Sequence, residues 1–449
     1  MSFRSAAIVG AGLAGCECAF ALAAAGVSVS LFEMKPGRFS PAHTNPDCAE
    51  LVCSNSFRSS APDSAVGLLQ EEMRALGSLC LNVADICRVP AGKALAVDRQ
   101  LFAKEMTRRV QEKSGISLKR REILSLGAPG DPALDPALAG HDLIVVSAGP
   151  LAGEALTASL GSLAGAEELY FYDAIAPVLD GASINTDIAF AAGRYRPEEG
   201  DYLNCPLDRE AYTIFRQALL DGERVPARAF EEEKHFEGCM PIETLAERGF
   251  MTLAFGPLKP VGFTDPRNGE RPFALLQLRA EDSNRSMFNL VGCQTKLKQN
   301  EQERIFRLIP GLEKAEFVRY GSVHRNTFVN APKVLSPDLS LRARPEVFLA
   351  GQITGVEGYV ESAACGLWLG KYLGAKAQGR NLSPPPPETA LGALLGHLQN
   401  PAKRFQPSNV QFGLMPELGR RAKHDARRLL YAERGREAFR VWLDTSRPD

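Results

Sequence analysis

Two cysteines near the N-terminus lie close enough in sequence to a predicted cofactor site to do chemistry there. Cys53 lies in the segment ELVCSNS, twenty residues after Glu33, and Cys48 precedes it in a CxxxxC spacing. A cysteine in such a place is a buried packing residue, one half of a redox pair, or a nucleophile. The elements that position the two thiols therefore decide what the protein does.

The segment before these cysteines has the pattern of a dinucleotide-binding unit. An apolar strand, AAIVG, leads into the loop Gly10-Ala-Gly12-Leu-Ala-Gly15, which opens an Ala-rich helix, and a second strand, VSVSLFE, follows. Glu33 ends that strand eighteen residues after Gly15, where a carboxylate can bind a ribose hydroxyl. A lone GxGxxG is a weak signal, but a strand before it and a helix after it make it specific.

Two further glycine-containing turns predict that the cofactor is contacted by both ends of the chain. The strand HDLIVVSAGP at 141–150 ends in Gly149-Pro150, and EVFLAG at 346–351 leads through a glycine-punctuated loop into a helix starting near Gly358. Ligands collect at the carboxyl ends of strands in doubly wound folds, and a helix N-terminus offers unpaired N–H groups. This arrangement favours FAD, whose flavin lies far from its adenine, over NAD. The residues expected to bind it are Gly10, Gly12, Leu13, Ala14, Gly15, Glu33, Gly149, Gly351, Gln352, Glu357, Gly358 and Tyr359.

A chain of 449 residues predicts two domains. We expect an α/β, Rossmann-like FAD-binding domain of the glutathione-reductase type, made discontinuously from 1–150 and 325–449. Short β-rich pieces such as ELYFYDAIAPVL and FALLQLRAE indicate an inserted α+β domain at 151–324, which carries Cys239. A helix is predicted at 65–76, and the proline run at 384–387 predicts a stiff linker into a last helical segment.

Composition narrows the classes of partner. No apolar run is long enough to cross a bilayer, and the first strand begins too early for a signal peptide, so we expect a cytoplasmic protein. The cysteine spacings argue against zinc and against a disulfide scaffold. The net charge is −1, but residues 401–441 hold ten basic and four acidic residues, a local charge of +6. Such a segment either contacts phosphates or is a solvated helix face.

The CxxxxC spacing is also that of the redox pair in flavin disulfide reductases. Those enzymes carry a nicotinamide-binding Rossmann unit in mid-chain and a C-terminal His/Glu pair, and neither is visible here. Gly366, Gly370 and Gly374 are spaced at four residues, which predicts close helix packing and lends the redox interpretation no support.

The remaining motifs resemble the folate- and FAD-dependent tRNA (uracil-5-)-methyltransferases, the TrmFO family. The matching segments run in order from residue 5 to about 416: GAGLAG, ELVCSNSFRS, AVGLLQEEMR, FEGCMPIE, GPLKPVG, GSVHRNTFVNAP, AGQITGVEGYVESAACG and FQPSNVQFGLMP. The AGQITGVEGYVESAACG block is shared with the larger GidA relatives, whereas ELVCSNS, FEGCMPIE and FQPSNVQFGL are specific to the methyltransferases. Cys48 departs from the family pattern, in which an apolar or aromatic residue is usual.

The resemblance implies methylation of a T-loop uridine of tRNA (position 54), with 5,10-methylenetetrahydrofolate as carbon donor and reduced FAD, regenerated by NADPH or NADH, as reductant. It implies that Cys239 attacks the uracil ring, while Cys53 assists as acid/base or protects the flavin-bound carbon. A thiolate suits addition to uracil C6 because it is nucleophilic at an accessible pKa and leaves readily. Buried structural roles for either thiol stay open at this point.

Further site candidates follow from the same resemblance. His324, Arg325 and Asn326 are candidates for folate contacts, and a satisfied core histidine is the alternative for His324. Lys403 and Arg404 are candidates for tRNA phosphate. Two other functions stay open: the same chemistry on ribosomal RNA, and a flavin-containing RNA-binding protein whose catalysis is secondary.

Overall fold

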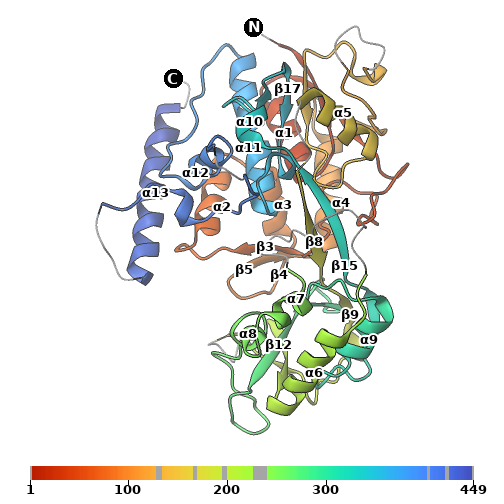
Figure 1. The fold of residues 1–449 in the computed structure, drawn as a ribbon. Coiled ribbons are helices and arrows are strands. Elements are labelled where there is room, and N and C mark those ends of the chain that lie inside the picture. The colour runs from red at the N-terminus through yellow and green to blue at the C-terminus, as the bar shows by residue number, and fades with distance from the viewer. Residues whose placement is uncertain are drawn as a thin grey trace.

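The chain forms two bodies, each with its own sheet and core (Figure 1). A computed structural model describes residues 3–127, 134–164, 169–194, 200–225, 240–401, 405–419 and 424–446. The buried apolar residues divide into one large cluster drawn from residues 6–160 and 328–442 and a second drawn from residues 179–315. The first body is therefore assembled from both ends of the chain.

The first body is built on a six-stranded sheet. Its order is β16 (Ser340–Leu341), β17 (Arg344–Leu349), β7 (Leu143–Val146), β1 (Ser5–Val9), β2 (Ser28–Glu33) and β6 (Ile116–Arg120). All neighbours are parallel except β16, which pairs antiparallel with β17 at the edge. The chain runs from β1 to β2 on one side and later to β7 on the other. The strand order therefore reverses at β1, and such a switch point is where doubly wound sheets bind ligands.

Helices and a small second sheet complete this body. The sheet has the order β3 (Ser56–Ser59), β5 (Ala94–Val97), β4 (Arg88–Val89). The helices are α1 (Leu13–Ala24), α2 (Ala65–Ala75), α3 (Leu79–Ile86), α4 (Arg99–Glu112), α5 (Glu154–Ala164), α10 (Ala331–Val334), α11 (Tyr359–Ala377), α12 (Ala390–His397) and α13 (His424–Ser446). The helix predicted at 65–76 and the strands of the opening unit are confirmed within one or two residues.

Helices α1 and α11 are in close contact along a seam of small residues. A Cβ added at Gly370 would lie 2.8 Å from the Cys18 carbonyl oxygen, and one at Gly374 would lie 2.8 Å from Ala25 Cβ. At Gly366 it would overlap the backbone of Ala14. The prediction that these three glycines serve close helix packing is confirmed.

The second body has a six-stranded sheet with helices packed against it, as Figure 1 shows in its lower half. The strand order is β10 (Phe190–Ala191), β11 (Tyr202–Leu207), β12 (Ala274–Ala280), β13 (Met287–Leu290), β9 (Val178–Asp180) and β14 (Phe317–Arg319). The helices are α6 (Arg209–Asp221), α7 (Ile242–Glu247), α8 (Thr252–Phe255) and α9 (Gln299–Phe306). The β-rich pieces expected in this part of the chain are confirmed.

A two-stranded ribbon joins the bodies. Strand β8 (Leu169–Ile175) pairs antiparallel with β15 (Ser322–Phe328), from Leu169 opposite Phe328 to Ile175 opposite Ser322. A buried amide adds a second link, because Asn55 donates to the carbonyls of Val97 and Ala280, at 2.9 Å each. The inserted sheet is thus fastened next to the segment that carries Cys53.

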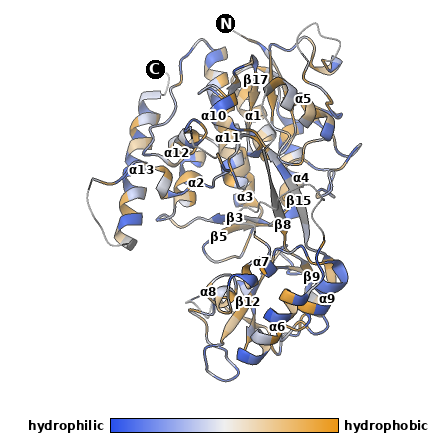
Figure 2. Ribbon diagram, viewed as in Figure 1, coloured by the Kyte–Doolittle hydropathy of each residue, from blue (hydrophilic) through white to orange (hydrophobic). Residues whose placement is uncertain are grey.

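The last helix, α13, lies on the outside of the first body beside α2 (Figure 1). Figure 2 shows both hydrophilic and hydrophobic stretches along it, as expected for a helix with one face on the body. Tyr431, Phe439 and Trp442 are buried against the core. Among the described residues no helix has the length and apolar character needed to cross a membrane.

Candidate functional site

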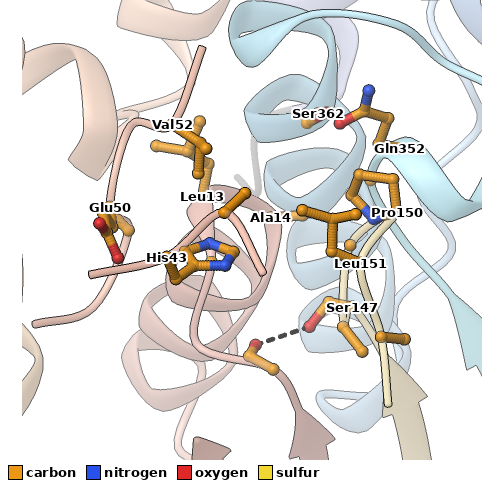
Figure 3. Close-up of a pocket in the computed structure, with 18 of the residues that line it drawn as sticks. Leu13, Ala14, His43, Glu50, Val52, Ser147, Pro150, Leu151, Gln352 and Ser362 are labelled. Atoms are coloured by element: carbon orange, nitrogen blue, oxygen red, sulfur yellow. Dashed lines mark hydrogen bonds between the residues drawn. The ribbon is translucent and has the colours of Figure 1, made fainter. Parts of the chain in front are cut away.

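A cavity of about 580 Å³ opens at the carboxyl ends of β1, β2, β7 and β17, at the switch point of the sheet. This volume is in the usual range for a ligand site. Every residue predicted to bind the cofactor lines it except Gly15. Figure 3 shows Leu13 and Ala14 between His43 and Val52 on one side and Pro150 and Gln352 on the other. The segment before Cys53, the turn after β7 and the start of α11 therefore surround one space.

Each glycine of the glycine-rich loop is needed for a different structural reason. Gly10 has a φ of +103°, and a Cβ there would meet the backbone of Ala148 at 2.6 Å. At Gly12 a Cβ would meet nothing within 4 Å, so the backbone is open to a ligand. At Gly15 a Cβ would overlap the Gly10 carbonyl and lie 2.6 Å from Ser147 Oγ. Gly15 thus serves the contact between loop, helix and strand rather than the cavity surface.

Two helices begin at the cavity wall. The N-caps Gly12 of α1 and Gly358 of α11 both line it, and neither provides a side-chain hydrogen bond to its helix. Uncapped N–H groups and the positive end of the helix dipole favour negative charge. The arrangement suits a pyrophosphate at one helix and an electron-rich ring at the other.

Side chains around the cavity also fit a dinucleotide cofactor. Glu33 is almost fully buried, and its two carboxylate oxygens accept from the backbone N–H groups of Ala11 (3.1 Å) and Lys35 (3.0 Å). These contacts fix the carboxylate at the end of β2 and leave each oxygen a further lone pair for a hydroxyl. Ser362 Oγ is buried on the cavity wall without a hydrogen-bond partner in the described structure, so a bound ligand can satisfy it.

Cys53 lines the same cavity and is held by the first residue of α11. The Tyr359 hydroxyl accepts from the backbone N–H groups of Cys53 (2.8 Å) and Ser54 (3.2 Å). Burial is the main cause that raises the pKa of Tyr359, and the nearby charge of Cys53 raises it further. Tyr359 is therefore a neutral phenol at physiological pH. With both lone pairs occupied by amides, its own O–H is available for donation.

Cys48 lies in a different environment. It is fully buried, and its backbone N–H donates to Thr107 Oγ1 at 2.8 Å. A hydrogen bond between the thiols of Cys48 and Cys16 lowers the pKa of Cys48 and raises that of Cys16. None of the nine described cysteines forms a disulfide. Cys53 faces the cavity while Cys48 belongs to the core beneath the glycine-rich loop.

Several predicted site residues fall outside what the structure describes. Cys239, Lys403 and Arg404 are in undescribed segments. His324 and Arg325 are placed by their backbone only, opposite Asp173 and Tyr172 in the ribbon β8–β15. Their neighbour Asn326 is buried and lines the cavity.

The segment after Cys239 can be followed to the cavity wall. The N–H of Ile242 donates to the carbonyl of Gln294, which lines the cavity, at 2.7 Å. Glu243 is fully buried and accepts from Thr295 Oγ1 (3.0 Å) and the Lys296 N–H (2.7 Å). Burial raises the pKa of Glu243. The start of α7 is thereby fixed beside the cavity.

The basic residues of α13 are largely used within the protein. Arg436 pairs with Glu71 of α2 at 2.6 Å, and Arg428 pairs with Asp63 at 3.3 Å. Arg434 donates to the carbonyls of Pro416 and Glu417. These three arginines therefore dock the last helix on the first body, a role that differs from both alternatives expected for the +6 segment.

Sequence reasoning missed lining residues that come from distant elements. Arg279, Gln294 and Asn409 all line the cavity, although Asn409 lies in the quoted segment FQPSNVQFGLMP and Gln294 directly follows Cys293. Arg279 could have been noticed because it is a charge near the end of the otherwise apolar strand FALLQLRAE. In the described part of the chain, no group of three or more His, Cys, Asp or Glu residues could hold a metal ion.

Comparison with known proteins gives matches along nearly the whole chain. A family model described as "Glucose inhibited division protein A" matches residues 5–381. A protein of Oleidesulfovibrio alaskensis named methylenetetrahydrofolate–tRNA-(uracil-5-)-methyltransferase TrmFO is 64% identical over 441 residues, which cover 98% of this chain and 97% of that protein. A Geobacter sulfurreducens protein of the same name is 52% identical over 440 residues, covering 98% of each.

Among solved structures, the Aquifex aeolicus GidA protein in its form I crystal superposes with a TM-score of 0.69 at 16% sequence identity. The match covers 98% of this chain and 76% of that one. At this level of identity the likeness concerns the fold alone, and it confirms the α/β architecture with its parallel sheet.

Proposed function

Because this chain belongs to the glucose inhibited division protein A family, and within it to the TrmFO proteins, we propose that it methylates C5 of a T-loop uridine in tRNA. The carbon donor is 5,10-methylenetetrahydrofolate, the cofactor is FAD, and NAD(P)H is the reductant. The observation that carries the proposal is identity of 64% along 98% of the chain, with Cys53 lining the cavity that suits a dinucleotide. A cytoplasmic location is part of the proposal, because tRNA is its proposed substrate.

The cavity residues can hold FAD. The loop Gly10–Gly12 and the N-terminus of α1 would receive the pyrophosphate, Glu33 a ribose hydroxyl, and the N-terminus of α11 the flavin. When bound and reduced, FAD supplies the two electrons that take a carbon at the formaldehyde level to a methyl group. The protein positions the reactants and excludes water around them.

Cys239 is the proposed nucleophile toward uracil. Its thiolate adds to C6, which turns C5 into an enolate carbon able to attack the donor carbon. The bond from that carbon to the donor nitrogen breaks, and the electron pair leaves with the nitrogen. A base then removes the C5 proton, and the thiolate leaves from C6 to restore the ring. In support, Ile242 is only three residues beyond Cys239 and is bonded to the cavity-lining Gln294. Three residues reach at most about 10 Å, so the position of Ile242 is compatible with the proposed role.

Cys53 is proposed to act beside the flavin as an acid/base group or as a guard of the activated carbon. Its position on the cavity wall, next to the neutral Tyr359, supports this role. His324 and Arg325 are proposed folate contacts, because their neighbour Asn326 lines the cavity. Lys403 and Arg404 are proposed contacts to tRNA phosphate.

The test is formation of 5-methyluridine by the purified protein, measured by nucleoside mass spectrometry. An unmodified tRNA transcript, methylenetetrahydrofolate and NADPH are supplied. Cys239→Ala and Cys53→Ala should each keep bound flavin and lose methyluridine by at least about a hundredfold, the usual scale for losing a group that acts on the reacting atoms. Cys205→Ala is the matched control, because that thiol is fully buried in the second core, and it should stay active.

Two outcomes would redirect the proposal. Methylation of a ribosomal RNA transcript but not of tRNA would move the same chemistry to the other substrate. Tight tRNA binding together with a cellular phenotype rescued by Cys53→Ala/Cys239→Ala would indicate an RNA-binding protein instead. Full activity of Cys239→Ala would remove the nucleophile assignment.

A further inference from the structure

The peptide bond that precedes Cys53 is held from both sides. The carbonyl of Val52 accepts from Arg99 Nη1 (3.0 Å) and from Arg319 Nη1 (3.2 Å). The N–H of the same peptide unit belongs to Cys53 and donates to the Tyr359 hydroxyl at 2.8 Å. In a trans peptide the C=O and N–H point in opposite directions, so guanidinium groups lie on one side and the phenol on the other. Charge-assisted hydrogen bonds of this kind are the stronger ones.

A third arginine holds the residues that follow Cys53. Arg279 Nη2 donates to Ser54 Oγ at 2.6 Å, and its Nε donates to Asn55 Oδ1 at 2.8 Å. Arg279 and Arg319 belong to β12 and β14 of the second body, whereas Arg99 begins α4 of the first. The backbone around the thiol is therefore fixed by side chains of both bodies.

The cluster carries more positive than negative charge. One carboxylate, Glu281, pairs with Arg99 at 2.7 Å. The cluster therefore has three guanidinium groups and one carboxylate paired with them. Arg319 Nε and Nη2 are buried and make no hydrogen bond within the described residues. Burial lowers the pKa of Arg279 and lowers that of Arg319 to about 10. A guanidinium stays protonated in proteins, so each is counted as a cation. A negative charge on Cys53 offsets part of this lowering at Arg319.

We propose that Arg99, Arg279 and Arg319 are positioning residues that keep Cys53 as a thiolate at neutral pH. Excess buried positive charge stabilises the thiolate, which is the reactive form. Because two of the arginines come from the second body, the thiol is activated only while that body is docked on the first. The remaining charged or titratable groups near this segment are Glu50 paired with Lys35, Arg58 paired with Glu361, Glu281, Tyr202 beside Arg279, and Tyr359.

The inference rests on the proposed role of Cys53, but it can be tested on the thiol without any substrate. Purified protein is treated with iodoacetamide at several pH values, and alkylation of the Cys53 peptide is followed by mass spectrometry. Arg319→Gln removes one charge and should raise the apparent pKa of the thiol by about one unit, so the midpoint of the alkylation profile moves up and alkylation below the wild-type midpoint slows by up to roughly tenfold. Arg319→Lys keeps the charge and should stay close to the wild-type profile. Arg304→Gln, an exposed cation of α9 paired within its own helix, is the control.

Glu281→Gln provides a test of opposite sign, which also serves if Arg319→Gln does not fold. Removing the single carboxylate of the cluster should lower the apparent pKa of Cys53 and speed its alkylation at pH values below the wild-type midpoint. A purely structural cluster would change the rate in the same direction in both variants. The proposal would be overturned if the pH profile of Cys53 alkylation did not shift, or if Arg319→Gln and Glu281→Gln shifted it in the same direction. It would also be overturned if Arg319→Lys gave the same profile as Arg319→Gln. Wild-type protein with the expected alkylation profile but no methyluridine would instead refute the proposed function alone.

Discussion

One added methyl group at Gly370 should destabilise the first body measurably. Its Cβ would lie 2.8 Å from both the Cys18 carbonyl oxygen and Ala21 Cβ. Carbon atoms in contact prefer about 3.5–4.0 Å, so α1 and α11 must separate by roughly 0.7–1 Å at this point. A gap of that size forfeits about a quarter to a half of the dispersion energy of each atom pair facing it.

The magnitude follows from two opposing effects. Overpacking of this kind costs typically about 1–3 kcal/mol, and the upper half of the range applies because one obstructing atom is a backbone carbonyl. Replacing glycine by alanine inside a helix returns about 0.5–1 kcal/mol of backbone propensity. We therefore expect Gly370→Ala to lose about 1–2.5 kcal/mol of unfolding free energy. Gly396→Ala in α12, where a Cβ would meet nothing within 4 Å, should gain about 0.5–1 kcal/mol.

The assay is guanidinium chloride unfolding followed by tryptophan fluorescence. The chain has two tryptophans, Trp368 on α11 and Trp442 on α13, with ring centroids 6.3 Å apart. Both therefore report on the first body and not on the second. Gly366→Ala should additionally release flavin, because it would push on Ala14, a residue of the cavity wall. Equal stabilities of Gly370→Ala and Gly396→Ala would refute the reasoning that this seam is at its closest approach.

Two further predictions concern the support of the fold. Glu72 is fully buried and caps the first amides of α12, and burial raises its pKa to about 8. Between about pH 5 and 8 the folded state binds a proton that the unfolded state has released, so the unfolding free energy should fall as pH rises, by up to about 1.4 kcal/mol per pH unit. A pH series of denaturant melts should show this slope for the wild type and not for Glu72→Gln. Arg436→Ala breaks a part-exposed ion pair with Glu71 and should lower the unfolding free energy by less than about 1 kcal/mol. It should also speed amide hydrogen exchange in α13. Arg440→Ala is the control, because its partners lie on its own helix, and the exchange of α13 should then stay near wild type.

The parts of the site that a local pattern specifies were predictable. The loop Gly10–Gly15, the carboxylate of Glu33 and the start of α11 each follow from a strand, a turn and a helix within a short segment, because close backbone approach and free N–H groups restrict the residue types. The seam of Gly366, Gly370 and Gly374 was visible for the same reason, since residues four apart share a helix face.

The surroundings of Cys53 were not predictable in this way. Arg99, Arg279 and Arg319 lie on three separate elements and meet only when the second body docks on the first. A single sequence contains no periodicity that relates such positions. The fate of Cys48 was likewise set by tertiary packing, because its contact with Cys16 depends on how the loop after β2 folds back under α1.

The seam between α1 and α11 has a consequence for the protein during its synthesis. Helix α1 ends at Ala24 and its partner begins at Tyr359, so about 335 residues must be translated after the first helix before the second exists. At bacterial rates of roughly 5–20 residues per second, that interval lasts about 20–70 seconds. Throughout it the small-residue face of α1 has no helix to cover it, whereas the second body is complete before α11 emerges. During synthesis, therefore, the second body can fold while the N-terminal part of the first body still lacks the helix that completes it.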